Sequence, residues 1–182
     1  SGLIALDWWN GNRSILDDSD LSGAIIGLTL LTKPEEIYRT LIESTAFGTR
    51  KIIENYRDAG LNVSEIFVCG GIPQKNQLLL QIFADVLNRE IRVADSNQVT
   101  ALGSAIFAAT AAGAEKGGYD TIFDAVEKLA KVKKETIIPN RDNVERYNQL
   151  YEIYQKLHNY LGTEHADLMH QLKQMKTEFI YI

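Results

Sequence analysis

Short apolar runs alternate with stretches of helical periodicity over the first two thirds of the chain. Strands are predicted at residues 2–6, 23–30, 66–69 and 90–93, and helices follow the last three of them, up to residues 58, 87 and 112. Such alternation indicates an α/β sheet with parallel strands joined by right-handed crossovers. Because ligands bind beyond the carboxyl ends of the strands in such sheets, a ligand is expected at the connections after the strands at 66–69 and 90–93.

The helix after the second strand has a predicted start and end. Thr32 followed by Glu35 matches a capping box with Pro34 in the first turn, and Gly60 follows the predicted last residue near Asp58. One apolar face is expected along residues Ile37, Leu41, Thr45, Gly48, Ile52 and Tyr56. The small residues Ser44, Ala46 and Gly48 would let this helix approach a sheet closely.

The helix 100–112 is unusually rich in small residues, with Thr100 as its expected cap, so we expect it to pack tightly. Gly103 weakens its first turn by about 1 kcal/mol relative to Ala, and close contact with a helix or with a ligand would explain the residue. A polar-faced helix is predicted over residues 120–132.

The tail from Asn140 predicts two amphipathic helices that are broken near Gly162. The first stripe consists of Tyr147, Tyr151, Tyr154, His158 and Leu161, and the second of Leu168, Leu172, Met175 and Phe179. A tyrosine stripe at this spacing favours burial against the rest of the domain over a cofactor site.

Composition narrows the function classes. The 182 residues are 45% hydrophobic with a net charge of −5, and the 19 Lys and Arg are scattered, which disfavours nucleic acid as a partner. The apolar runs are too short to cross a membrane, and the N-terminus has no leader pattern. The single cysteine excludes an internal disulfide and fits a cytoplasmic location. The abrupt Ser-Gly start suggests a piece of a larger protein.

The stretch 65–87 carries the main candidate for a binding site. Gly70 and Gly71 separate a strand from a helix, so the backbone there is free of side chains and the helix start offers unpaired N–H groups. This suits an anion or the polar edge of a nucleotide, and a tight connection without a ligand is the alternative. The pair satisfies no named phosphate motif. Cys69, which has no nearby His, is interpreted as a small buried residue.

The loop 7–13 combines two tryptophans with polar residues around a glycine. One tryptophan is expected in the core, and Arg13 either pairs with Asp7 or Asp17 or faces a ligand. A metal site is not expected, because the acidic residues after Leu16 lack EF-hand spacing and the three histidines lack a zinc pattern.

Several segments together resemble the carboxy-terminal half of the FGGY carbohydrate kinases. Residues 23–43 carry Gly-x-Ile-x-Gly-Leu and, after seven residues, Glu-Ile, with Thr40 where the family usually has Ala or Ser. Residues 68–90, which begin Val-Cys-Gly-Gly-Ile-Pro-Gln-Lys-Asn, resemble the adenosine motif, and 99–105 resemble the helix that follows it. The opening 2–13, with Trp-Trp-Asn-Gly-Asn-Arg, is similar to the L-ribulose branch of the family.

The resemblance implies a fold and an activity. The fold is an α/β, ribonuclease H-like domain of the actin/hexokinase/Hsp70 type, incomplete at its N-terminal edge, over residues 1–135, with a helical extension packed on it over 136–182. The parent enzyme would transfer the γ-phosphoryl group of ATP, with Mg²⁺, to the terminal hydroxyl of L-ribulose. Gly70 and Gly71 would pass beneath the nucleotide, and Lys75 or Asn76 would contact its ribose or phosphates.

The chain departs from the family in what it lacks. It has no Asp-x-Gly-Thr phosphate loop and no aspartate in the context of the family's general base, so no catalytic residue is assigned here, and the base and most Mg²⁺ contacts are expected in an N-terminal kinase domain. The chain alone should therefore be inactive, and an unpaired sheet edge would favour homo-oligomers. The alternatives are a kinase for another pentulose or polyol, a non-catalytic nucleotide-binding or regulatory module of the same superfold, and a purely structural domain.

Overall fold

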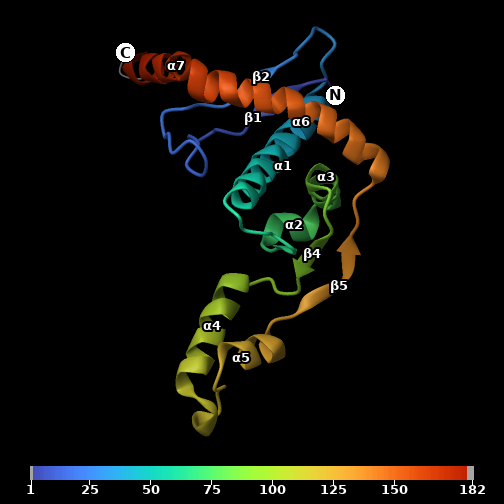
Figure 1. Cartoon of the computed structure of the whole chain (residues 1–182), viewed down its shortest axis with the longest axis vertical. Helices are drawn as coiled ribbons and strands as arrows, with labels where there is room; N and C mark the ends of the chain where they lie inside the picture. The colour runs from blue at the N-terminus through green and yellow to red at the C-terminus, as the bar shows by residue number, and fades with distance from the viewer. Residues whose placement is uncertain (1, 180–182) are drawn as a thin grey trace. The chain divides into compact units, whose positions relative to one another are not determined.

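The computed structural model describes residues 2–179, which form two compact units (Figure 1). The first unit contains the residues up to 64, residues 85–88 and those from 140 onward, and the second contains 65–84 and 89–139. The elements of the first unit are β1 (Ile4–Leu6), β2 (Ala24–Ile26), α1 (Pro34–Asp58), α6 (Arg141–Asn159), the π-helical turn η2 (Tyr160–Glu164) and α7 (Ala166–Phe179).

The second unit is built around a small sheet. Its elements are β3 (Ile66–Val68), α2 (Gly71–Lys75), α3 (Gln77–Leu87, whose last residues cluster with the first unit), β4 (Ile91–Ala94), α4 (Val99–Ala112), the 3₁₀ turn η1 (Ala114–Lys116), α5 (Ile122–Leu129) and β5 (Val132–Ile137). The core of this unit consists of Leu80, Ala84, Ile91 and Val93, against which residues of β3 and β5 pack. No helix within residues 2–179 has both the length and the apolar character that crossing a bilayer requires.

The two sheets confirm one part of the predicted topology and correct another. β3 and β4 are parallel, with Ile66 opposite Ile91, as the alternation predicted. β2 instead pairs antiparallel with β1, Ile26 lying opposite Ile4, so the prediction of parallel strands from the second strand onward is wrong. An antiparallel pair needs only a connecting loop, whereas a parallel pair needs a crossover, and no helix separates β1 from β2.

β5 was not predicted, and the reason lies in its residues. It pairs antiparallel with β4 at the edge of the three-stranded sheet, and its first four residues are exposed. The segment reads Val-Lys-Lys-Glu-Thr-Ile, which lacks the alternation of a half-buried strand. The predicted helix over 120–132 accordingly ends earlier, at Leu129.

Helix α1 begins one residue later than its sequence pattern predicted. The N-cap is Lys33, whose backbone N–H donates to Glu36 Oε2 at 2.9 Å, while Thr32 Oγ1 accepts from the N–H of Thr29 at 2.8 Å. The helix ends at Asp58 as expected, followed by Gly60 at φ +84°. The capping pattern therefore located the start to within one residue and the end correctly.

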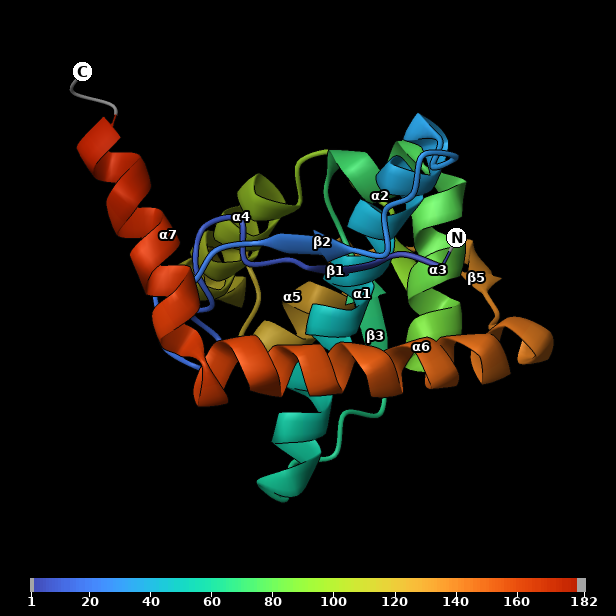
Figure 2. The same cartoon turned by 90° about the horizontal axis from the view of Figure 1, so that it is seen from above.

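The buried face of α1 differs from the predicted stripe. Its buried residues are Thr40, Ile42, Glu43, Ser44, Ala46 and Phe47. The helix contacts β1 and also exchanges side-chain hydrogen bonds with α6, so a wider arc of its surface is covered than one apolar stripe would indicate. Figure 2 shows α6 lying across α1.

The tyrosine stripe of α6 is core, as predicted. Tyr147, Tyr151, Tyr154 and His158 are all buried. The Tyr147 hydroxyl has a partner, because it donates to Glu43 Oε1 at 2.9 Å, and Arg39 Nε donates to the same oxygen at 2.7 Å. The buried Glu43 carboxylate is thereby paired and hydrogen-bonded, as a buried charge must be.

The predicted break near Gly162 is confirmed. The second predicted stripe is wrong as a buried face, because Leu168, Leu172 and Met175 are exposed and Met169 is buried in their place, while the side chain of Phe179 lies outside the described residues. The π-helical turn η2 lies between α6 and α7, with Gly162 buried inside it. A π turn advances the chain by a different angle per residue than an α-helix, so the periodicity of α6 does not carry over into α7. Figure 2 shows α7 turning away from α6 at this point.

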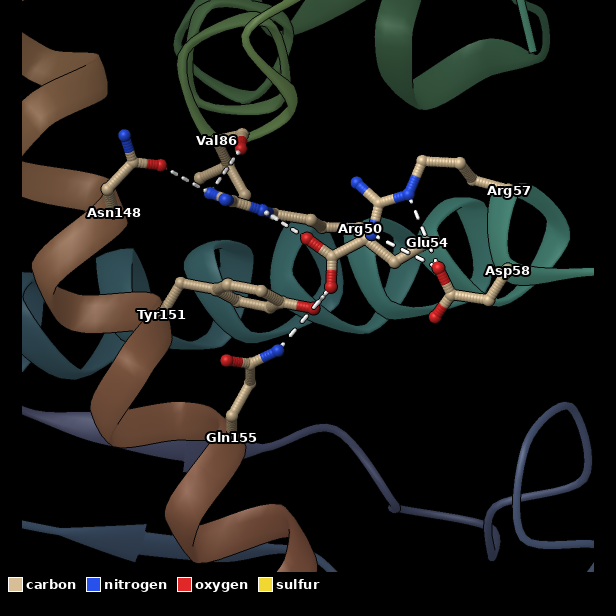
Figure 3. A network of polar contacts seen from close by, with 8 residues as sticks. All are labelled: Arg50, Glu54, Arg57, Asp58, Val86, Asn148, Tyr151 and Gln155. Carbon is tan, nitrogen blue, oxygen red and sulfur yellow. Dashed lines mark hydrogen bonds and ion pairs between the residues drawn. The ribbon is translucent and has the colours of Figure 1, made fainter. Parts of the chain in front are cut away.

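Arg50 joins α1 to α6 through a network of polar contacts (Figure 3). Its Nε lies 3.1 Å from Glu54 Oε1, and its Nη1 donates to Val86 O at 3.2 Å and to Asn148 Oδ1 at 2.8 Å. The guanidinium also lies 4.1 Å from the centroid of the Tyr151 ring, whose hydroxyl donates to Glu54 Oε2 at 2.6 Å. The network ties two helices that are distant in sequence.

Replacing Tyr151 by phenylalanine should lower the free energy of unfolding by about 1–2 kcal/mol, because Glu54 loses a short hydrogen bond while the ring remains packed. Tyr160→Phe is the matched control, since the Tyr160 side chain is half exposed, and it should change stability by less than about 0.5 kcal/mol. Urea unfolding followed by circular dichroism measures both. Equal losses in the two variants would contradict the role given to the Tyr151 hydroxyl.

Helix α4 does not pack as its composition suggested. Of its residues only Ile106 is buried, and a Cβ at Gly103 would meet no atom of the described chain within 4 Å. The N-cap is Gln98 in place of Thr100. Close helix packing therefore does not explain Gly103 within the described residues.

Replacement by alanine should change the stability of the fold in opposite directions at two helical glycines. A Cβ at Gly48 in α1 would overlap the carboxylate of Asp7, whereas Gly103 in α4 has open space. We expect Gly48→Ala to destabilise the fold by about 1–3 kcal/mol through this clash. Gly103→Ala should stabilise it by about 0.5–1 kcal/mol through helix propensity. Thermal unfolding measures the stability of both variants. A stabilising effect of Gly48→Ala would contradict the close approach of Asp7 to α1.

Candidate functional site

The glycine turn after β3 is open to solvent. Gly70 has φ +105°, a conformation that suits glycine, and Gly71 begins α2. Both are exposed, and a Cβ built on either would meet nothing within 4 Å. Cys69 is exposed too, so its prediction as a buried residue is wrong. The strand ends at Val68, and the cysteine therefore belongs to the turn and does not reach the core.

Lys75 and Asn76 lie at the break between α2 and α3. Lys75 is exposed at the end of α2. Asn76 Oδ1 accepts from the N–H of Leu79 at 3.0 Å, so it caps the start of α3. The sequence predicted one helix here, and this capping residue divides it into two. The four predicted site residues thus share one short stretch, Gly70 to Asn76.

The turn lies beside the connection that follows β4. Gln74 Nε2 donates to Ser96 O at 2.8 Å, and Ser96 Oγ accepts from the N–H of Gln98 at 3.2 Å. Because β3 and β4 are parallel, both connections leave the same edge of the sheet, as predicted. Gln74 was not singled out from the sequence, although its polar amide in the first turn after the glycines was a usable signal.

A second concave region lies in the first unit, around Asp7. Trp8 is buried and Trp9 is half exposed, which confirms that only one of the two tryptophans enters the core. Among the described residues Arg13 forms no ion pair with Asp7 or Asp17. Asp7 Oδ1 instead accepts from the Tyr154 hydroxyl at 3.3 Å. Asp7, Trp8, Arg13 and Tyr154 border a pocket of about 130 Å³.

Burial sets the protonation of two groups in this pocket. It raises the pKa of the Asp7 carboxyl, and the hydrogen bond from Tyr154 opposes the shift. Burial also lowers the pKa of His158 to about 4, helped by the charge of Lys51. A polar contact with Asn159 opposes this shift of the His158 pKa. His158 is therefore neutral at pH 7, where it offers one donor and one acceptor.

Within residues 2–179 no group of three or more His, Cys, Asp and Glu side chains is arranged to hold a metal ion.

The parallel β3–β4 pair is followed by an open glycine turn, and residues 1–112 match the C-terminal domain of the FGGY family of carbohydrate kinases. The chain belongs to this family. It is similar to the ribulokinase of Anoxybacillus flavithermus, with 59% identity over 97% of this chain and 31% of the relative. It is 44% identical to the ribulokinase of Staphylococcus aureus, over 98% of this chain and 32% of the relative. The chain thus spans about a third of the length of these relatives.

Solved structures of sugar kinases share the fold. The xylulose kinase from Rhodospirillum rubrum is 27% identical with a TM-score of 0.75, over 93% of this chain and 32% of that one. The ligand-bound xylulose kinase from Lactobacillus acidophilus is 22% identical with a TM-score of 0.77, over 91% and 32%. The predicted fold class is confirmed.

Proposed function

We propose that this chain is the nucleotide-binding part of an ATP-dependent kinase that phosphorylates L-ribulose to L-ribulose 5-phosphate, a step in L-arabinose catabolism. The observation that carries the proposal is the 59% identity to a ribulokinase across 97% of the chain. The opening loop 7–13, with its Trp-Trp-Asn-Gly-Asn-Arg sequence, supports L-ribulose as the sugar. The likeness to xylulose kinase structures makes another ketopentose the second candidate.

The glycine turn fits an adenine nucleotide. Gly70 and Gly71 leave the space above the backbone open, and a bulky side chain at either position would occupy it. In the proposed complex they lie beneath the nucleotide, while the Lys75 ammonium or the Asn76 amide contacts its ribose or phosphates. MgATP supplies the transferable phosphoryl group. This chain contributes position and charge, which are the main demands of phosphoryl transfer.

The same proposal covers the organisation of the protein. Residues 1–135 are proposed as the C-terminal kinase domain and 136–182 as a helical extension packed on it. An N-terminal domain would supply the general base and most of the Mg²⁺ and sugar contacts. A cytoplasmic location and self-association of the isolated chain complete the proposal.

A chimera tests this function directly. The chain replaces the matching third of the Anoxybacillus flavithermus ribulokinase, and turnover of L-ribulose and D-xylulose is measured with a coupled ADP assay. We expect the chimera to phosphorylate L-ribulose with a kcat/KM within about tenfold of the parent, and the chain alone to give no turnover. A folded chimera without kinase activity would refute the proposal, and a preference for D-xylulose would select the second candidate.

A further inference from the structure

The pocket around Asp7 lies wholly within the first unit and apart from the glycine turn in sequence and in chemistry. Three segments line it: the loop after β1, the middle of α1 and the end of α6. Its volume of about 130 Å³ has room for several water molecules or one small organic molecule. The proposed function takes sequence support for L-ribulose from the loop 7–13, which contributes to this lining, but it assigns no ligand to the pocket.

The pocket is built from buried polar groups that lack partners. His158 is 2% exposed, and neither ring nitrogen has a hydrogen-bond partner among the described residues. The Nε1–H of Trp8, which is also 2% exposed, has none either. Buried polar atoms in native proteins form hydrogen bonds with protein, water or ligand. Two side chains without such partners in one pocket wall therefore indicate that the pocket holds an occupant.

The position of Asp7 is held by its surroundings. The Tyr154 hydroxyl donates to Oδ1, and the absence of a side chain at Gly48 makes room for the carboxylate against α1. Tyr154 is itself 1% exposed, so the Asp7 carboxylate accepts this hydrogen bond from a side chain that is fixed in the core. A fixed carboxylate beside unpaired imidazole and indole groups is a preorganised set of hydrogen-bonding partners.

The mixture of charges selects the class of ligand. Asp7 disfavours an anion, while Lys51 and Arg13 in the pocket lining disfavour a cation. A hydroxyl group both donates and accepts, so it can serve the Asp7 carboxylate, the cationic donors and the two orphaned ring groups in turn. A neutral molecule with several hydroxyls matches this lining better than any singly charged ligand does.

We propose that the pocket formed by Asp7, Trp8, Lys51, Tyr154 and His158 binds a neutral, pentose-sized polyol as an accessory site. The site is separate from the nucleotide cradle and does not depend on the proposed kinase function. Its occupant accepts hydrogen bonds from Lys51 and donates to Asp7, while His158 and Trp8 gain the partners that the protein does not provide.

The two tryptophans of the chain provide the test. Both are labelled as 5-fluorotryptophan, and ¹⁹F NMR follows a titration of the chain with ribitol. We expect the Trp8 resonance to shift saturably, with half-saturation at about 1–10 mM, while Trp9, which is outside the pocket lining, stays unchanged as an internal control. Asp7→Asn should weaken binding at least about tenfold, whereas Glu35→Gln, an exposed acid in the first turn of α1, should leave it unchanged.

Several outcomes would overturn the inference. The first is the absence of a Trp8 shift up to 100 mM ribitol in a chain that circular dichroism shows to be folded. The second is an equal Trp8 shift in the wild type and in Asp7→Asn. The third is saturation of the Trp8 shift with inorganic phosphate but not with ribitol. The same titration of the chimera, with the same variants, decides the question if the chain does not fold alone. The ¹⁹F shift of Trp8 reports ribitol binding in this pocket and does not depend on kinase activity. An inactive chimera would therefore not affect the binding result, and an active chimera would not by itself support the accessory site.

Discussion

Replacing Gly71 by valine in the chimera is expected to raise the KM for ATP at least about 30-fold, equivalent to about 2 kcal/mol, and to leave the KM for L-ribulose within about twofold. Gly71 has open space where a Cβ would lie, so the new side chain projects into the region assigned to the nucleotide. Its bulk would lift the nucleotide off the backbone. Initial-rate kinetics with each substrate varied in turn measure the effect.

The substitution is informative because the fold should tolerate it. Gly71 does not have a left-handed φ, unlike Gly70 at +105°, and no neighbour within 4 Å would clash with a side chain. Ala108→Val, at an exposed position of α4 in the same unit, is the matched control and should leave both KM values unchanged. If Gly71→Val folds normally and its ATP kinetics match the control, the glycine turn is not the nucleotide floor.

The local architecture of this turn could be predicted because its signals lie close together in the sequence. The apolar run before Gly70, the glycine pair and the next strand at Ile91 each depend on neighbouring residues. The parallel pairing that follows from them brought Gln74 to Ser96, as expected for connections at one sheet edge. The sequence therefore predicted the strands and the glycine turn that form the candidate site, while its ligand is a proposal.

Predictions failed where tertiary contacts override a local pattern. β2 has the composition of a sheet strand, but composition does not specify its partner, which is β1. The stripe on α7 was predicted from the spacing of its own apolar residues, but Leu168, Leu172 and Met175 are exposed and Met169 is buried, so spacing alone did not identify the covered face. The small residues of α4 indicated tight packing, but small side chains only permit close approach and do not supply a neighbour.

The pocket around Asp7 could not have been predicted as a site. Asp7 and His158 come from opposite ends of the chain, and only the packing of α6 on α1 and β1 brings them to one cavity. The sequence indicated that the loop after β1 was unusual and that the α6 stripe was buried. It did not indicate that the two features meet.

Stability should fall as the pH drops from about 6.5 to about 4, and His158 should account for about 3 kcal/mol of the loss. Burial holds the folded pKa of His158 at about 4, below the ordinary value of 6.5. The unfolded chain therefore takes up this proton first as the pH falls. The contribution of His158 to the free energy of unfolding is therefore complete above pH 6.5 and is lost as the pH approaches 4.

Asp7 acts in the opposite direction. Burial raises its folded pKa above the ordinary 3.8, so the folded chain binds this proton at a higher pH than the unfolded chain does. Protonation of Asp7 therefore returns some stability at the acidic end of the range. The net effect of His158 is best read as a difference between variants, in which the titration of Asp7 and of the surface carboxylates largely cancels.

His158→Phe removes the titrating group while keeping an aromatic ring against Trp8 and Tyr154, whose ring centroids lie 5.1 and 5.9 Å from that of His158. We expect the free energy of unfolding of this variant, measured with urea at pH 7.5 and 4.5, to fall less between the two values than that of wild type, by about 2–3 kcal/mol. His165→Phe, at an exposed position, should keep the wild-type dependence. If His158→Phe loses as much stability as wild type on acidification, His158 is not held neutral in the folded chain, and its place among the hydrogen-bonding groups of the pocket would have to be revised.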